Sequence, residues 1–166
     1  MASTRKSARR KPSLSAAQIR SARENGPIGR YVGAQIRLTH VAAVDVLEAL
    51  FAPFKSSPVR FALLDHVHAF PGSTQATLAE ILDVDRTTLV PMIASLEEQG
   101  LLRRERLTDD RRATQVWVTP KGLTLLNKLK PVAGEHDRRL RRGLSEGEVK
   151  SFLSVLQKMR DNLAGD

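Results

Sequence analysis

Basic side chains dominate the stretch of chain between Asp83 and Thr119. Six arginines fall within it, and several of them flank or enter the polar turn Thr108–Arg112. A guanidinium stays protonated in proteins and matches the geometry of phosphate and carboxylate oxygens. The arginines of this stretch are therefore suited to binding anions. An exposed basic turn of this kind favours a polyanionic partner.

Enzymatic chemistry is not indicated by the sequence. It contains no phosphate-binding loop, no nucleophile with an arranged base and no pair of acids in the context of a pocket. No cysteine is present, and the histidines lack the spacing of metal ligands: His40, His66, His68 and His136. We therefore expect no catalytic activity, no metal and no other cofactor.

A helix is predicted directly before the basic turn. Leu89, Ile93 and Leu96 repeat at helical spacing, so they mark a buried face. Asp85 stands where it can cap the helix, and Gly100 stands where a left-handed residue would end it. The opposite face of this helix is left free for a partner.

Two strands and two shorter helices complete the predicted centre of the chain. Leu101–Leu107 and the β-favouring run Thr114–Val118 flank the turn, which indicates a hairpin with a basic tip. Upstream, one helix opens at Pro58 and another is capped by Thr74. Their predicted inward residues are Phe61, Leu64, Val67, Leu78, Ile81 and Leu82. Three helices followed by a hairpin form a winged helix-turn-helix.

Long amphipathic helices flank this centre on both sides. The first runs from Ile28 to just before Pro53, with its stripe at Ile28, Val32, Gln35, Ile36, Thr39, Ala43, Val46, Leu47 and Leu50. The next starts at a cap formed by Thr119 and Pro120 and should bend at Pro131, with its stripe at Leu123, Leu126, Leu129, Val132 and Leu140. The last starts at a capping box of Ser145 and Glu148, with its stripe at Val149, Phe152, Leu153, Leu156, Met159 and Leu163.

The two terminal stripes are too apolar to face water. Leaving both exposed would forfeit many kcal/mol at roughly 25 cal/mol per Å². They could pair within one chain, but pairing with a second copy buries more, so we expect a homodimer. The predicted fold is mainly α with a small β-hairpin wing and an α-helical dimerisation lobe built from the N- and C-terminal helices.

We predict four parts along the chain: a basic flexible arm at 1–26 with a helical turn near Ala16–Arg23, a dimerisation helix and loop at 27–57, a winged helix at 58–119, and C-terminal helices at 120–166. The arm has seven Lys or Arg and one Glu, so it carries +6 of the +9 formal charge. Such an arm is either a solvated tail or a segment that attracts nucleic acid or an anionic membrane surface. No apolar run reaches the roughly 20 residues that span a bilayer, so we expect a soluble, cytoplasmic protein without a membrane partner.

Five motifs together resemble the MarR family of bacterial transcriptional regulators. They are Thr74–Ala79, Asp85–Leu89, Leu96–Leu102, Asp110–Arg112 and Val118–Gly122. In this order and spacing they cover about residues 28 to 163. The resemblance implies a homodimer whose two winged helices bind a palindromic operator in double-stranded DNA, and a small, often aromatic or phenolic, ligand or an oxidant that releases the DNA.

The resemblance also implies DNA contacts. Asp110 and Arg112 match the family's Asp-x-Arg pair, in which the carboxylate orients a guanidinium that enters the narrow minor groove. Phosphate contacts are expected from Arg106 and Arg111. The groove-facing side of the helix is expected to carry Arg86, Thr87, Thr88 and Pro91. The alternative for the hairpin tip is a solvated turn with a surface ion pair worth under about 1 kcal/mol.

A ligand cavity is expected between the first, second and fifth helices of the family fold. Its predicted rim is Arg37, His40, Phe54, Arg60 and His66. Cations and aromatic walls suit an aromatic acid, a phenol or an acyl-CoA-like effector.

Trp117 is expected to pack on the stem of the wing rather than contact a partner. The leading function is a ligand-responsive repressor, and the alternative is a ligand-independent architectural or interaction protein.

Overall fold

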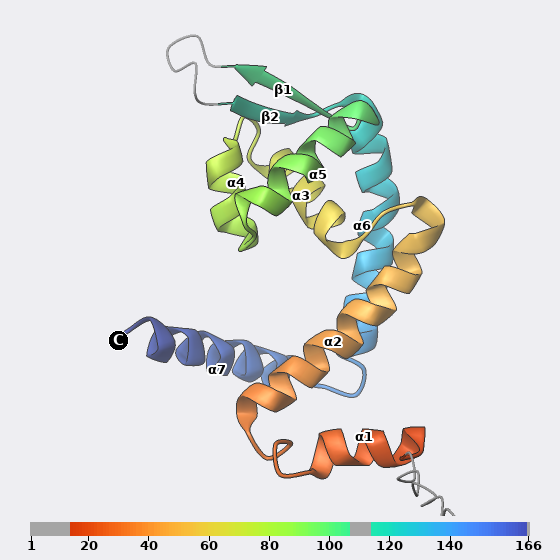
Figure 1. Ribbon diagram of the computed structural model, residues 1–166, viewed down its shortest axis with the longest axis vertical. Helices are drawn as coiled ribbons and strands as arrows, with labels where there is room; N and C mark the ends of the chain where they lie inside the picture. The colour runs from red at the N-terminus through yellow and green to blue at the C-terminus, as the bar shows by residue number, and fades with distance from the viewer. Residues whose placement is uncertain (1–13, 107–113, 166) are drawn as a thin grey trace, which may run out of the picture. The chain divides into compact units, whose positions relative to one another are not determined.

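The computed structural model describes residues 14–106 and 114–165. The chain divides into two compact units, Met1–Ala43 and Val44–Asp166. Helix α2 (Val32–Phe51) crosses the boundary between them, and Figure 1 shows the elements in order. Within the described ranges, no helix is both long enough and apolar enough to cross a membrane.

The first unit holds a full helix where the sequence analysis expected a helical turn near Ala16–Arg23. Helix α1 (Ala16–Asn25) begins at a full capping box, because the Ser15 side chain accepts from the Gln18 backbone and the Gln18 side chain returns to the Ser15 backbone. Gln35 then donates from Nε2 to the carbonyls of Glu24, at 3.3 Å, and Gly29, at 2.5 Å. Helix α1 thus extends the helical turn expected within the arm at 1–26, and the signal for the start of the helix is the Ser-x-x-Gln spacing.

The second unit contains the predicted three helices and hairpin. Its elements are the short 3-10 helix η1 (Ala52–Phe54), α3 (Pro58–Ala69), α4 (Gln75–Leu82), α5 (Arg86–Glu98), β1 (Leu102–Arg106), β2 (Thr114–Val118), α6 (Pro120–Leu140) and α7 (Glu146–Ala164). The two strands pair antiparallel, with Leu102 opposite Val118 and Arg106 opposite Thr114. The winged helix-turn-helix fold predicted from the sequence is confirmed.

One buried cluster holds this unit together. It takes leucines and other aliphatic side chains from α3, α4, α5, β1, β2 and α6: Leu63, Leu64, Val67, Leu78, Ala79, Leu89, Ile93, Leu96, Leu101, Leu102, Val116 and Leu126. Next to it, Phe51 at the end of α2 is fully buried, with its ring centroid 5.4 Å from that of Phe61 on α3. Large aliphatic burial of this kind supplies most of the stability of a small helical domain.

Several predicted inward residues are exposed instead. Ile81 is 44% exposed, because the short α4 buries the face that carries Leu78 and Ala79. Leu140 is 50% exposed at the end of α6. Conversely, Leu63 is fully buried on α3 although the sequence analysis did not single it out. Asp85 is the N-cap residue of α5 as predicted, but its side chain makes no capping hydrogen bond.

The wing stem is anchored to the loop between α3 and α4. Gly72 donates to the Val116 carbonyl at 3.2 Å, and Val116 donates to the Ser73 carbonyl at 3.0 Å. Gly72 has φ +80°, and a Cβ there would meet the Trp117 ring at 3.1 Å. On the other side, the Arg103 guanidinium lies 5.0 Å from the centroid of that ring. The prediction that Trp117 packs on the stem is confirmed.

Apolar side chains remain exposed along the terminal helices in a single copy of the chain. On α2 they include Val32, Ile36, Val41 and Leu50, and on α7 they include Phe152, Leu153, Val155 and Leu163. The capping box of Ser145 and Glu148 that starts α7 is present as predicted. Exposed apolar residues in such numbers are typical of a surface that another chain covers.

Candidate nucleic-acid interface and adjoining cavity

Helix α5 separates a buried face from a polar, exposed one. Leu89, Ile93 and Leu96 are buried in the core cluster, as predicted. The residues predicted to face a groove are all exposed: Arg86, Thr87, Thr88 and Pro91. The Thr side chains offer both a hydroxyl and a methyl group, which suits the edges of bases as well as phosphates.

The N-terminal end of α5 is electrostatically poor as a phosphate site. Glu80, Asp83 and Asp85 border the same open depression as Arg86. Three carboxylates near one guanidinium oppose a polyanion, so attraction must come from elsewhere. The exposed Arg106, at the end of β1 next to the turn, is one such source. Asp110, Arg111 and Arg112 lie outside the described residues.

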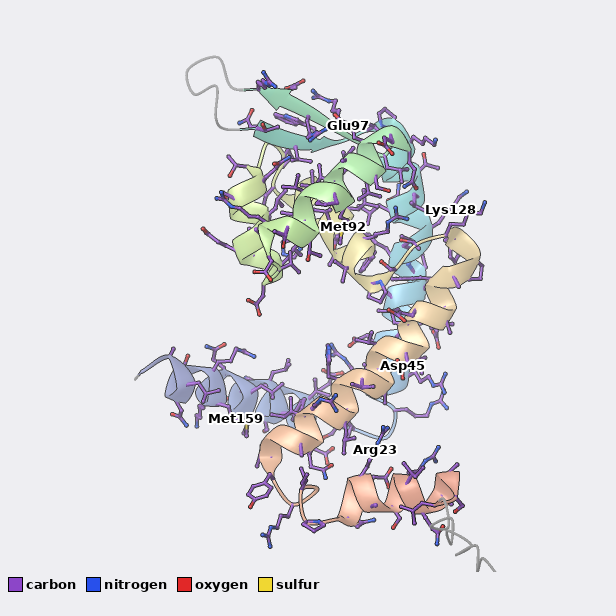
Figure 2. All side chains as sticks on the ribbon, viewed as in Figure 1. Arg23, Asp45, Met92, Glu97, Lys128 and Met159 are labelled. Atoms are coloured by element: carbon purple, nitrogen blue, oxygen red, sulfur yellow. The ribbon has the colours of Figure 1, made fainter. Side chains whose placement is uncertain are left out.

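The C-terminal end of α5 is tied to the hairpin. Glu97 accepts from Arg104 Nε at 2.7 Å and from the Arg104 backbone amide at 3.2 Å. Figure 2 shows Glu97 at the end of α5 nearest the strands. Arg103, the preceding residue on β1, pairs with Glu105 and stacks on Trp117. These contacts fix the angle at which the wing leaves the helix.

A cavity of about 350 Å³ adjoins the same end of α5. Its apolar lining comes from Phe54, Leu96, Leu101 and Leu125. Four cationic residues line it as well: Lys55, Arg60, Lys121 and Lys128. No Asp or Glu is among the residues that line this cavity. An apolar pocket with several cations and no acid is complementary to an organic anion.

The cations of this cavity also hold the surrounding backbone. Arg60 donates from Nη1 to the Lys55 carbonyl at 3.2 Å and from Nη2 to Ser95 Oγ at 3.1 Å. Lys121 donates from Nζ to the Gln99 carbonyl at 2.7 Å. The cavity wall and the end of α5 are therefore parts of one hydrogen-bonded network.

Comparisons with known proteins agree on one family. Residues 57–114 match the model of the MarR family. The solved structure of a transcriptional repressor, CouR, bound to a 23-mer DNA duplex, is 29% identical, with a TM-score of 0.75 over 81% of this chain and 96% of that one. The winged-helix part of the chain thus matches the MarR family, and the chain as a whole resembles MarR-family regulators.

Two further structures extend this result. The transcriptional regulator SlyA is 26% identical, with a TM-score of 0.74 over 81% of this chain and 95% of that chain. The PcaV transcriptional regulator from Streptomyces coelicolor, solved in complex with its natural ligand, is 22% identical, with a TM-score of 0.71 over 81% of this chain and 94% of that chain. The latter shares the fold. The winged helix of this chain is thus similar to the winged helices of solved transcriptional regulators.

The cavity gathers only part of the predicted ligand rim. Phe54 and Arg60 line it, whereas His66 does not, because its Nδ1 lies 3.1 Å from the Ala62 carbonyl on its own helix. Arg37 and His40 belong to the first unit. There Arg37 lines a separate apolar cavity of about 380 Å³ together with Arg23.

Sequence analysis missed six polar residues of the larger unit's cavity: Lys55, Ser56, Gln99, Lys121, Thr124 and Lys128. A signal for part of this set was present in α6. Lys121, Thr124, Leu125 and Lys128 follow the spacing i, i+3, i+4, i+7, which places them on one face of a helix. Lys55 and Ser56, from the loop before α3, have no such periodic spacing that could have identified them.

Glu97 should titrate below the ordinary range of a glutamate. The side-chain hydrogen bond from Arg104 is the main cause of its lowered pKa. A carboxyl whose pKa is lowered by folding stabilises the fold above its unfolded pKa, and this contribution is lost as the pH falls through the folded pKa. Carbon-detected NMR titration should show the Glu97 pKa rise in Arg104→Gln and stay low in the control Arg106→Gln. An unchanged Glu97 pKa in Arg104→Gln would show that Arg104 is not the cause of the lowered value.

Proposed function

We propose that this protein is a transcriptional repressor of the MarR family that binds a palindromic operator as a homodimer and leaves it when a small organic anion binds. The observation that carries the proposal is the exposed polar face of α5, with Arg86, Thr87, Thr88 and Pro91, set beside a basic hairpin. The similarity to CouR, a repressor solved on a DNA duplex, supports the same use of this face.

In the proposed complex, α5 enters the major groove and the wing follows the backbone. Thr87 and Thr88 would then meet base edges or phosphates, and Arg106 and Arg111 would meet phosphates. Arg112, oriented by Asp110, would enter the adjacent minor groove, where a narrow A·T-rich segment concentrates negative potential. Since α5 has a single basic residue in its first turns, most of the salt-dependent attraction would come from the wing.

The proposed homodimer forms through the terminal helices. Exposed apolar side chains on α2 and α7 would be covered by the second copy. A two-fold dimer presents two winged helices, so the operator should contain two half-sites about 10 bp apart, or a multiple of that, in inverted orientation. The proposed division into arm, dimerisation helix, winged helix and C-terminal helices follows from this arrangement.

The proposed effector occupies the cavity lined by Phe54 and Arg60. PcaV, which shares the fold, is a regulator solved with its natural ligand. About 350 Å³ is near the lower end of the usual size of a ligand pocket, so it suits an aromatic acid or a phenolic acid. An acyl-CoA-like effector would have to place its nucleotide outside this cavity.

Selection of bound duplexes from a random DNA pool tests the function. The proposal predicts enrichment of an inverted repeat, and a footprint that covers both halves of it. A specific site is typically bound about 10³ to 10⁷ times more tightly than random DNA. A pool that shows no enrichment would overturn the proposal and favour the ligand-independent architectural protein.

Arg112→Ala should weaken operator binding about 5- to 150-fold, because a minor-groove guanidinium contributes roughly 1 to 3 kcal/mol. Fluorescence anisotropy on the selected duplex measures the affinity. The matched control is Arg138→Ala, which removes the same charge from α6, where Arg138 pairs with Glu135. Equal affinities of Arg112→Ala and the unmodified protein would remove the wing from the mechanism.

A further inference from the structure

The C-terminal end of α5 depends on cations supplied by other elements. Its last turn has no basic residue and carries Glu97 and Glu98, while a helix C-terminus is itself the negative end of a dipole. The compensating charges are Arg60 from α3, Lys121 from α6 and Arg104 from β1. The order of this helix end is therefore sensitive to anything that competes for those cations.

Ser95 is the point at which Arg60 meets α5. Its hydroxyl accepts from Arg60 Nη2 at 3.1 Å and from Gln99 Nε2 at 3.1 Å. Gln99 Nε2 also donates to the Ser95 carbonyl at 2.8 Å, and the Gln99 carbonyl accepts from Lys121. One guanidinium and one ammonium thus clamp the last turn of the helix through Ser95 and Gln99.

Both members of this clamp also line the cavity described above. Arg60 and Lys121 share it with Lys55 and Lys128, so an anion entering there meets the same donors that hold α5. One hydroxyl group that lines the cavity makes no hydrogen bond within the described residues. It is Ser56 Oγ, which is buried. A buried hydroxyl left in this state is a site for a ligand atom.

We propose that an aromatic carboxylate in this cavity acts on α5 by taking Arg60 and Lys121 away from Ser95 and Gln99. The inference rests on the proposed effector-responsive function and identifies how its ligand site is coupled to DNA binding. The carboxylate accepts from Arg60 and Lys121, Ser56 Oγ donates to it, and the aromatic body packs among Phe54, Leu96 and Leu125. The last turn of α5 then loses its clamp.

This coupling satisfies the energetic requirement for a switch. A ligand shifts a conformational equilibrium only by the difference between its affinities for the two states. The carboxylate binds the released state more tightly, because in the clamped state Arg60 Nη2 and Lys121 Nζ are engaged by α5. Release of the last turn of α5 also shifts Glu97, which holds the wing through its hydrogen bond with Arg104. Helix and wing are therefore affected together.

Amide hydrogen exchange on the full chain with 2-naphthoate tests the coupling without DNA. The amides of Gln99, Gly100 and Leu101 bond to the last turns of α5 and report its order. Saturating 2-naphthoate should speed their exchange at least about threefold in the unmodified protein, and the neutral isostere 2-naphthamide should not. Binding itself is followed by the fluorescence of 2-naphthoate.

Two variants separate coupling from binding. Ser95→Ala removes the acceptor of Arg60 on α5 and keeps every cation of the cavity, so it should bind 2-naphthoate at least as tightly and exchange faster without it. Binding should then accelerate exchange less than in the unmodified protein, because only the contact of Lys121 with Gln99 is left to release. Lys128→Gln removes a cation that lines the cavity, so it should bind 2-naphthoate about fivefold more weakly but show the full acceleration at saturation.

Three results would overturn the inference: no binding of 2-naphthoate at millimolar concentration, binding without faster exchange, or full acceleration in Ser95→Ala. Failure of the proposed function is recognised separately, because it would appear as an absence of selective duplex binding while the exchange result stands. Conversely, selective DNA binding with unchanged exchange would retain the regulator and discard this route of coupling.

Discussion

Gly122→Ala is expected to lower the free energy of unfolding by about 3 kcal/mol, since overpacking a rigid site costs that much. Gly122 is buried in the first turn of α6, and a Cβ there would lie 2.1 Å from the Leu101 carbonyl oxygen and 2.9 Å from a methyl group of Val118. The carbonyl cannot turn away freely, because it accepts from the Thr119 backbone at 3.1 Å and from Thr119 Oγ1 at 3.2 Å. Urea unfolding at a fixed protein concentration measures the loss.

Gly134→Ala is the matched control on the same helix. The nearest atom to a Cβ at Gly134 is the end of the Arg138 side chain, at 3.9 Å. Alanine there should stabilise the protein by about 0.5 to 1 kcal/mol through its helix propensity. Equal effects of the two substitutions would show that the close approach of α6 to Leu101 does not constrain the fold.

Leu89→Ala is expected to cost about 2 to 5 kcal/mol, the usual range for a leucine removed from a packed core. Leu89 is fully buried on α5 and belongs to the cluster that joins the helices to the hairpin. A loss of this size is a large fraction of the stability of a small domain, so thermal unfolding should shift by many degrees.

Its neighbour on the same helix provides the control. Val90 is 38% exposed, so Val90→Ala should change the free energy of unfolding by less than about 1 kcal/mol. The comparison separates the buried face of α5 from its exposed face by stability alone. A large loss in Val90→Ala with little loss in Leu89→Ala would contradict the orientation of the helix.

Local signals in the sequence were sufficient to predict most of the fold. Caps at Thr74, Thr119 and Ser145 mark helix starts by residue type, and each side chain makes the expected hydrogen bond in the structure. The hairpin follows from its β-favouring second strand. The same rule places the start of α1 at Ser15 and Gln18, where the sequence analysis expected only a helical turn.

Long-range contacts could not be predicted in this way. Arg60 and Ser95 are separated by 35 positions, and no periodicity relates them. Ile81 was wrongly expected inside because apolar residues lie on more than one face of this eight-residue helix, which leaves its inward face ambiguous. Of the five residues predicted to rim a cavity, Phe54 and Arg60 alone line the cavity next to α5. A cavity is made by side chains from several elements, so their types alone do not reveal it.

The most direct test of the central claim compares two duplexes. Binding of the full chain is measured by fluorescence anisotropy at physiological salt, first on the duplex selected from a random pool and then on the same duplex with its inverted repeat scrambled. The account predicts a preference of at least about 10³ for the intact repeat. A preference of less than about tenfold would contradict it. Attraction between the basic surface and the phosphates acts alike on both duplexes, so a small preference would mean that the protein does not read the sequence.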